Sequence, residues 1–300
     1  MLKKLYNYSG LRILHGIYEA KRLRKTIAQS SVKDVNELQI KDYKKSDKLF
    51  ILGSGYSITS LNEKDWEHIK THDSIGFNAW VFHDHTPTYY CMETPTKSAH
   101  FDAILNALNT KKKQYAKVPF IIQYQHLIKS TNNYKNLELP KENVYYNAPF
   151  MPNTTSKYLL KKLLQWWASK HSKNMHWLIH YSGSLSYIVA MGYMMGYKEI
   201  VLLGVDLNDS RYYFQDQGAN EGSKKYAKIH ESTMKDMNRM ATGSIHDTVN
   251  IKRTINYGCL PIDGYLYSFN KIMRKKGVKL SIGNKKSRLS EGLPVYEFPS

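Results

Sequence analysis

Residues 47–58, which read DKLFILGSGYSI, constrain the fold of this chain more than any other stretch. Four apolar residues run directly into Gly53-Ser54-Gly55. A short apolar run closed by a glycine-rich turn is typical of a buried parallel strand followed by a loop. Glycines there let the backbone approach a ligand, and in an open α/β sheet this is the usual position of a nucleotide. A tight connection without a ligand explains the same pattern equally well.

Two further predicted strands also end in polar residues. Residues 73–78 end at Asn78, and residues 88–93 end at Glu93. The carboxyl ends of parallel strands lie along one edge of a sheet, so we expect these side chains and Ser54 to converge there. This repetition predicts a binding site better than any one of the motifs does.

The clearest supersecondary pattern lies in residues 180–206. Ser182-Gly183 precedes a strongly apolar helix predicted over residues 185–195, and Gly196 follows it as a C-terminal cap. A buried strand over residues 198–206 then ends at Asp206. A helix followed by such a strand is half of a βαβ unit. Ser182 and Gly183 therefore fall at a helix N-terminus, where free amides favour a phosphate.

The remaining pattern completes an α/β chain. We predict helices over residues 61–69, with Asn62 as N-cap, and over 101–108, 156–167, 224–240 and 264–276, and strands over 118–123 and 278–282. Residues 145–152 and 242–258 read as irregular connections, and the basic tail from Gly283 as a surface segment.

Three parts of the chain differ in composition. Residues 1–46 form a basic N-terminal extension with Leu11, Leu14, Tyr18 and Leu23 on one helical face, followed by a polar linker over residues 29–46. Such a helix can lie on an anionic membrane or pack against protein. Residues 47–206 and 263–300 form the α/β domain. Residues 207–262 are polar and rich in Tyr and Lys, as expected of a lid or acceptor-binding insertion.

Composition narrows the function classes. The chain has 300 residues, a net charge of +19 and 24 tyrosines, which favours polyanionic partners such as nucleic acid, anionic membrane or phosphorylated substrates. Cys91 and Cys259 have no metal-ligand or disulfide spacing, so a reducing compartment is expected. We expect neither a signal peptide nor a membrane-spanning helix.

These motifs together resemble the bacterial sialyltransferases of glycosyltransferase family 42. The resemblance rests on the Gly53 loop, on Ser182-Gly183, and on Gly196-Tyr197-Lys198-Glu199-Ile200 leading into Gly204-Val205-Asp206. It implies a Rossmann-like domain of the GT-A variant type with a mostly parallel sheet and a small lid. It also implies a CMP-sugar donor, inversion at the anomeric carbon, and no cofactor or metal.

Carried over position by position, the resemblance implies a donor nucleotide site and a catalytic group. The implied donor-binding residues are Gly53, Ser54, Gly55, Ser57, Asn78, Glu93, Ser182, Gly183 and Asp206. Tyr212 and Asn208 fall where the family places two tyrosines that stabilise the leaving phosphate, and His246 falls nearest to the family's base, with His180 as the alternative.

Several positions depart from the family pattern. Ser54 and Tyr56 replace an asparagine and a proline of the first loop, Glu93 stands near a donor-binding asparagine, and Ile179 replaces an arginine. The donor is therefore open among sialic acid and related nonulosonates that are activated as CMP esters.

The sequence thus predicts an inverting, metal-independent transferase that acts on a bacterial surface glycan or lipopolysaccharide. We expect it in the cytoplasm, peripheral to the inner membrane, without nucleic-acid partners and as a possible homo-oligomer. Two other classes stay open: a non-catalytic basic protein that binds nucleic acid or anionic membrane, and another nucleotide-sugar enzyme on the same fold. Scattered basic residues and the lack of an RNA-binding motif or helix-turn-helix count against the first.

Overall fold

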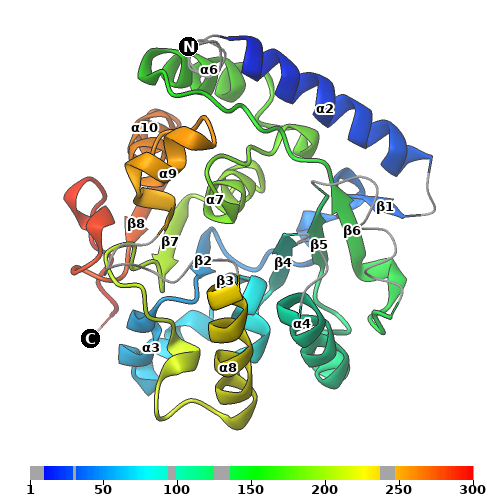
Figure 1. The fold of residues 1–300 in the computed structure, drawn as a ribbon, viewed down its shortest axis with the longest axis vertical. Helices are drawn as coiled ribbons and strands as arrows, with labels where there is room; N and C mark the ends of the chain where they lie inside the picture. The colour runs from blue at the N-terminus through cyan, green and yellow to red at the C-terminus, as the bar shows by residue number, and fades with distance from the viewer. Residues whose placement is uncertain (1–9, 30–31, 94–98, 125–135, 237–246, 300) are drawn as a thin grey trace.

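A parallel β-sheet with helices on both faces forms the body of the protein (Figure 1). The computed structural model describes residues 10–29, 32–93, 99–124, 136–236 and 247–299, without the side chains of residues 234–236, 247 and 253. The strands are β1 (Lys33–Asp34), β2 (Lys48–Leu52), β3 (Asp73–Phe77), β4 (Tyr89–Glu93), β5 (Phe120–Gln123), β6 (Val144–Asn147), β7 (Glu199–Leu203) and β8 (Lys279–Ile282). The α/β fold class predicted from the sequence is confirmed.

The order of the strands places β2 at the point where the sheet changes direction. Among the described residues the order is β1-β6-β5-β4-β3-β2-β7-β8, and every pair is parallel. From β2 the chain adds β3 on one side, whereas β7 and β8 are added on the other. The crevice outside the carboxyl ends of β2 and β7 is therefore the topological switch point of the sheet, where open α/β proteins bind ligands.

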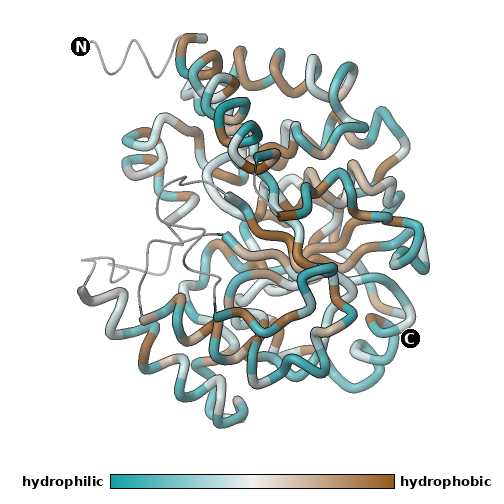
Figure 2. Tube along the Cα trace, turned by 90° about the vertical axis from the view of Figure 1, so that its right-hand side faces the viewer, coloured by the Kyte–Doolittle hydropathy of each residue, from teal (hydrophilic) through white to brown (hydrophobic). Residues whose placement is uncertain are grey.

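Strand β2 is apolar throughout because both of its faces are covered. Leu49 and Ile51 point into one hydrophobic cluster, and Phe50 and Leu52 into another on the opposite face. The strand β7 repeats this alternation, with Leu202 on the first face and Leu203 on the second. Figure 2 shows the strands as a brown, hydrophobic band through the centre of the molecule. Continuous apolar runs of this kind are typical of sheets that are buried on both sides.

The helices divide between the two faces of the sheet. They are α2 (Leu11–Ala28), α3 (Glu63–Lys70), α4 (Ala99–Thr110), α5 (Lys112–Tyr115), α6 (Lys157–Lys170), α7 (Ser184–Met194), α8 (Glu221–Asp236), α9 (Ile251–Asn256) and α10 (Ile262–Lys275). Side chains of α6, α7 and α10 belong to the first cluster, and side chains of α3, α4 and α8 to the second. Asn62 caps α3 as predicted, by accepting a hydrogen bond from the amide of Asp65.

Four sequence-based expectations about the elements are corrected. Residues 144–147 form strand β6 rather than part of a connection, and α9 lies within the stretch expected to be a loop. The expected linker contains β1, and Val35 just after it is buried in the core. The tail does not simply run over the surface, because Leu289 and Leu293 are buried and Phe298 stacks on Phe50.

The N-terminal helix α2 does not keep the four predicted apolar residues on one face. Leu23 is buried together with Ala20 and Ile27, whereas Leu11, Leu14 and Tyr18 are exposed. The helix is amphipathic, but its apolar residues are divided between the protein and the solvent. Within the ranges that the structure describes, no helix has the length and apolar character needed to cross a membrane.

Candidate ligand site

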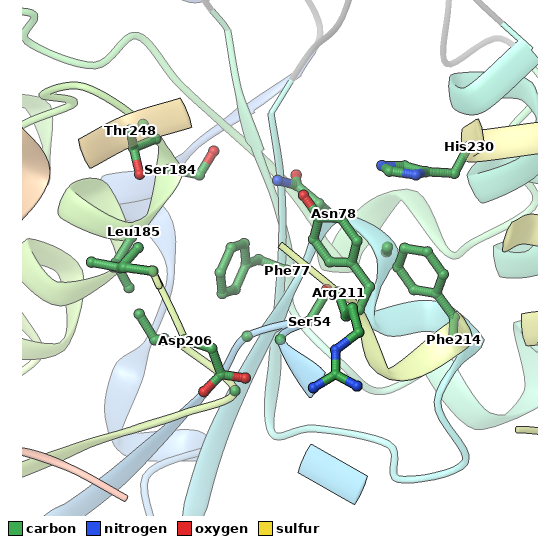
Figure 3. Close-up of a pocket in the computed structure, with 18 of the residues that line it drawn as sticks. Ser54, Phe77, Asn78, Ser184, Leu185, Asp206, Arg211, Phe214, His230 and Thr248 are labelled. Atoms are coloured by element: carbon green, nitrogen blue, oxygen red, sulfur yellow. The ribbon is translucent and has the colours of Figure 1, made fainter. Parts of the chain in front are cut away.

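A cavity of about 330 Å³ lies at the carboxyl ends of β2, β3, β4 and β7, at the topological switch point. Its volume falls at the lower end of the range for small-molecule sites. Nine residues singled out from the sequence line it: Gly53, Ser54, Gly55, Asn78, Glu93, Ser182, Gly183, Asp206 and Tyr212. Figure 3 shows side chains from several elements directed into this space. The structure thus brings together strand ends that are far apart in the sequence.

Glycines at the floor of the cavity let the ends of β2 and β7 approach each other. The Gly53 amide donates to Leu203 O, and the Gly55 amide donates to Gly204 O, both at 2.8 Å. A Cβ at Gly55 would lie 2.7 Å from Gly204 O, and one at Gly53 would collide with the same carbonyl oxygen. Gly204 itself has a φ of +63°, which side chains rarely allow. The glycine-rich turn is therefore required for the contact between the two loops.

Asp206 holds two loops at the edge of the cavity. Its carboxylate is buried, and it accepts hydrogen bonds from the Ser57 amide and from Asn284 Nδ2, both at 2.7 Å. The first bond fixes the turn after Gly55, and the second fixes the C-terminal loop against β7. Asp206 lines the cavity, but both carboxylate oxygens already accept hydrogen bonds from the protein. Its visible contribution is to position the Gly53 loop.

Two residues of the lining hold left-handed backbone conformations. Asn78 has a φ of +50° and Ser182 a φ of +60°, and they are the only non-glycine residues with positive φ among those described. Such conformations cost energy and concentrate at functional sites, although asparagine tolerates them better than most residues. Asn78 is further fixed because its Oδ1 accepts from the Glu93 amide at 3.1 Å. Asn78 is therefore held in place by its hydrogen bond to β4.

The N-terminus of α7 points at the cavity. Gly183 is its N-cap with a φ of +147°, and the Ser184 hydroxyl donates to Glu93 Oε2 at 2.5 Å. The first amides of a helix have no partner within the helix, so they can bind an anion. Across the cavity, the Ser54 amide makes no hydrogen bond within the described residues. These amides form two walls that suit a phosphate.

An aromatic wall closes the cavity on the side of α8. The ring of Tyr212 stacks on Phe214 at a centroid distance of 5.0 Å, and His230 meets Tyr212 edge-on at the same distance. Burial raises the pKa of Tyr212, so its hydroxyl stays protonated and can donate. Burial lowers the pKa of His230, so its imidazole stays neutral. Figure 3 shows His230 reaching toward the cavity opposite Asn78.

Arg211 adds a positive charge to the lining that was not predicted from the sequence. Its guanidinium lies 4.1 Å from the centroid of the Tyr56 ring and pairs with Asp209 at 2.7 Å. That ion pair raises the pKa of Arg211, so the side chain is charged. The sequence signal for Arg211 was its position five residues after Asp206, which ends a predicted strand. Tyr56 and Asp209 therefore both hold this arginine.

His100, Phe77, Phe214, Tyr226 and Thr248 also line the cavity without having been predicted. His100 hydrogen-bonds to the Tyr226 hydroxyl, and burial lowers its pKa to about 4. Phe77 ends β3, one of the predicted strands, whereas the other four lie on α4, α8 and connecting segments. No sequence signal relates His100 and Tyr226 to the Gly53 loop, because the packing of α8 on α4 brings them to the cavity.

Four predicted site residues do not appear in the lining. Ser57 binds Asp206 through its amide, and Asn208 bonds Lys286 O at 2.8 Å and the Arg288 amide at 3.1 Å. His180 is buried beside the cavity, where its Nδ1 lies 2.9 Å from Gln123 Oε1 and burial lowers its pKa. His246, predicted as the base, lies outside the described residues.

Within the described ranges, no three His, Cys, Asp or Glu side chains group closely enough to hold a metal ion, at the cavity or elsewhere. Cys91 and Cys259 are buried, and burial raises the pKa of the first thiol to about 12 and of the second to about 11. Neither thiol is therefore a nucleophile at neutral pH.

The fold and the cavity define an α/β protein with a candidate ligand site at the topological switch point of a parallel sheet. No family model matches the sequence, and no curated protein matches it. Among solved structures it is similar to the monofunctional alpha-2,3-sialyltransferase Cst-I from Campylobacter jejuni, with 12% identity, 89% of this chain and 82% of that chain covered, and a TM-score of 0.47.

Two structures of a second sialyltransferase are also similar. CstII from Campylobacter jejuni in complex with cytidine-5'-monophosphate has 15% identity, covers 83% of this chain and 84% of its own, and gives a TM-score of 0.44. A single-residue variant of Cst-II in complex with CMP has 19% identity, covers 83% and 85%, and gives a TM-score of 0.45. These are the kind of protein that the sequence motifs resemble. At such identities and TM-scores, a function has to be argued from the residues of the cavity.

Proposed function

We propose that this protein is an inverting glycosyltransferase that moves sialic acid or a related nonulosonate from a CMP-sugar to a hydroxyl of a bacterial surface glycan. The observation that carries the proposal is the convergence of the Gly53 loop, Asn78 and the α7 N-terminus on one cavity at the switch point. A glycine loop facing a helix N-terminus suits a nucleotide phosphate. The motif resemblance supports the choice of CMP among nucleotides.

In the proposed reaction, the acceptor hydroxyl oxygen bonds to the anomeric carbon while the bond from that carbon to the CMP phosphate oxygen breaks. Negative charge develops on the departing phosphate. The Tyr212 hydroxyl, which stays protonated, and the Arg211 guanidinium lie in the lining where they can stabilise it. Donors fixed before the reaction stabilise such charge most effectively because they need no reorganisation.

A base must take the proton of the acceptor hydroxyl. We assign this role to His246 on the motif, and the second candidate is His230, which lines the cavity with its pKa lowered by burial. A neutral imidazole can accept a proton near pH 7, so either histidine suits the role. We propose that no metal takes part, because CMP carries one phosphate and leaves no pyrophosphate for an ion to bridge.

Thermal unfolding with added nucleotides tests the proposed donor. We expect CMP at saturating concentration to raise the Tm of the full chain in the presence of EDTA, because ligands that bind only the folded state stabilise it. UDP and GDP are expected to leave the Tm unchanged. Gly53→Val, which places a bulky side chain against Gly204, is expected to abolish the shift.

The outcomes separate the three functional classes. A shift with UDP or GDP but not CMP would identify another nucleotide-sugar enzyme. No shift with any nucleotide would contradict catalysis and favour a basic binding protein. If CMP raises the Tm only when Mg²⁺ or Mn²⁺ is added, the metal-free mechanism is wrong, but the proposed donor stands.

A further inference from the structure

Large apolar side chains that face solvent gather on a few helices. Nine are exposed in the described part of the chain, and six of them lie on α2 or on α9 and the residue that follows it: Leu11, Leu14, Tyr18, Ile251, Ile255 and Tyr257. Leu14 and Tyr18 are more than 60% exposed, and Ile251 is 60% exposed. Scattered exposed apolar residues need no explanation, whereas a group of this size marks an interaction surface. We call these six residues the apolar rim.

The exposed face of α2 continues from apolar to basic along one line. Leu11, Leu14 and Tyr18 are spaced so that they share a face, and Lys21 and Lys25 continue it. Figures 1 and 2 both place this helix at the top of the molecule, on its outside. Its other side is packed, since Leu23 and Ile27 are buried.

Helix α9 carries the other part of the apolar rim, and residues on either side of it line the cavity. Thr248 before α9 and Ile262 after it both line the cavity. The part of the apolar rim on α9 therefore borders the cavity rather than an unrelated face.

The basic residues of α2 and α9 indicate which kind of partner the apolar rim contacts. Helix α2 carries five Lys and Arg residues and one acidic residue, Glu19, and Lys252 adds a further charge on α9. With a net charge of +19, two copies of this surface would repel each other, so a second copy is disfavoured. Exposed leucine and tyrosine side chains beside lysines match an anionic bilayer, where the apolar groups enter the headgroup region and the lysines remain near the phosphates.

We propose that the apolar rim, together with Lys21 and Lys25 of α2, docks on the surface of an anionic lipid bilayer and so holds the cavity near the membrane. The protein lies on the bilayer and does not cross it. Binding depends only on this surface, so it is independent of the function proposed above. If that function holds, docking presents the cavity to acceptors that are themselves anchored in the membrane.

Sedimentation of the full chain with vesicles tests the proposal. We expect binding to vesicles of phosphatidylcholine and phosphatidylglycerol at a 7:3 ratio, little binding to pure phosphatidylcholine, and a decline as salt rises. Leu11→Ser/Leu14→Ser, which leaves the charge unchanged, should weaken binding about ten-fold or more, because both leucines would enter the interface. Lys21→Glu/Lys25→Glu should do the same, since each lysine near the surface contributes about five-fold.

The matched control is Lys64→Glu/Lys113→Glu, which changes the net charge equally on α3 and α5, where no large apolar side chain is exposed. It should leave binding within about two-fold. The proposal is overturned if wild type does not bind, if the control loses as much as Lys21→Glu/Lys25→Glu, or if Leu11→Ser/Leu14→Ser has no effect. A dimer in vesicle-free solution that this last variant splits would assign the rim to self-association and also overturn it.

Discussion

The motif and the geometry of the cavity each indicate a different histidine as the base. The motif favours His246, whereas His230 is the histidine whose ring meets Tyr212 in the lining. We expect His246→Ala to lower transfer by about 100-fold or more, the usual effect of removing a general base, and to keep the CMP-induced Tm shift. His230→Ala should lower transfer only moderately, through the packing of the aromatic wall. Transfer assays with saturating CMP-sugar measure both effects.

The exposed His15 of α2 provides the control, and His15→Ala should be fully active. The opposite ranking of His230→Ala and His246→Ala would move the base to His230. In that case the acid limb of kcat/KM must lie below pH 6.5, because burial lowers the pKa of His230 from its ordinary value.

Single residues of the cavity were predictable where the chain enters it from a strand. Ser54, Asn78 and Glu93 each end an apolar run, so their convergence follows from parallel pairing. Arg211 and His100 were missed because they lie on a loop and on α4, and only tertiary packing directs them into the cavity. Asn208 was assigned by alignment of the motif, yet both ends of its amide are occupied by the C-terminal loop.

At the scale of elements, the contact between the ends of β2 and β7 is the most demanding part of the site. We expect Gly53→Ala to destabilise the protein by about 1–3 kcal/mol, as overpacking does, and to weaken CMP binding, because its Cβ would meet the Gly204 carbonyl. Gly264→Ala in α10 is the matched control. Its Cβ would meet nothing within 4 Å, so the change should stabilise by about 0.5–1 kcal/mol.

Urea unfolding followed by circular dichroism measures both variants. If Gly53→Ala and wild type have equal free energies of unfolding, the loops that follow β2 and β7 can move apart without destabilising the protein. The close contact would then be dispensable for the site.

The elements that could be predicted from the sequence are those whose apolar residues follow a pattern that indicates burial. β2 and β7 are apolar on both faces, and α7 is apolar all round. Strand β6 was missed because VYYN has a polar end and a proline soon after it, although all four residues are buried. Helix α9 was missed because it has six residues, too few for a clear period, and is formed by its surroundings rather than by propensity.

For the molecule as a whole, half-buried neutral histidines predict acid sensitivity. Burial lowers the pKa of His83 to about 3 and of His85 to about 4. In the unfolded chain both titrate near 6.5, so below that pH the unfolded state binds protons that the native state does not. The free energy of unfolding should therefore be constant above about pH 7 and fall as the pH drops toward 4. Each such histidine lowers it by at most about 1.4 kcal/mol per pH unit.

Urea unfolding at pH 7.5, 6.5 and 5.5 checks this prediction, and the window avoids most carboxylate titration. His15→Gln, at an exposed position, should leave the dependence unchanged. A free energy of unfolding that stays level down to pH 5 would contradict the burial of these two imidazoles in neutral form.

The central position of β2 has a consequence for how the protein is made. β2 can pair with β3 soon after both are synthesised. Its other neighbour, β7, begins at Glu199, so the β7-facing edge of β2 stays unpaired until about 150 further residues have been synthesised. At ordinary elongation rates this takes on the order of ten seconds, during which an apolar strand edge is open to other chains. Ribosome-released fragments that end before β7 should therefore be degraded by protease or captured by chaperones. Fragments that extend through β8 should resist, so the last third of the chain protects the first.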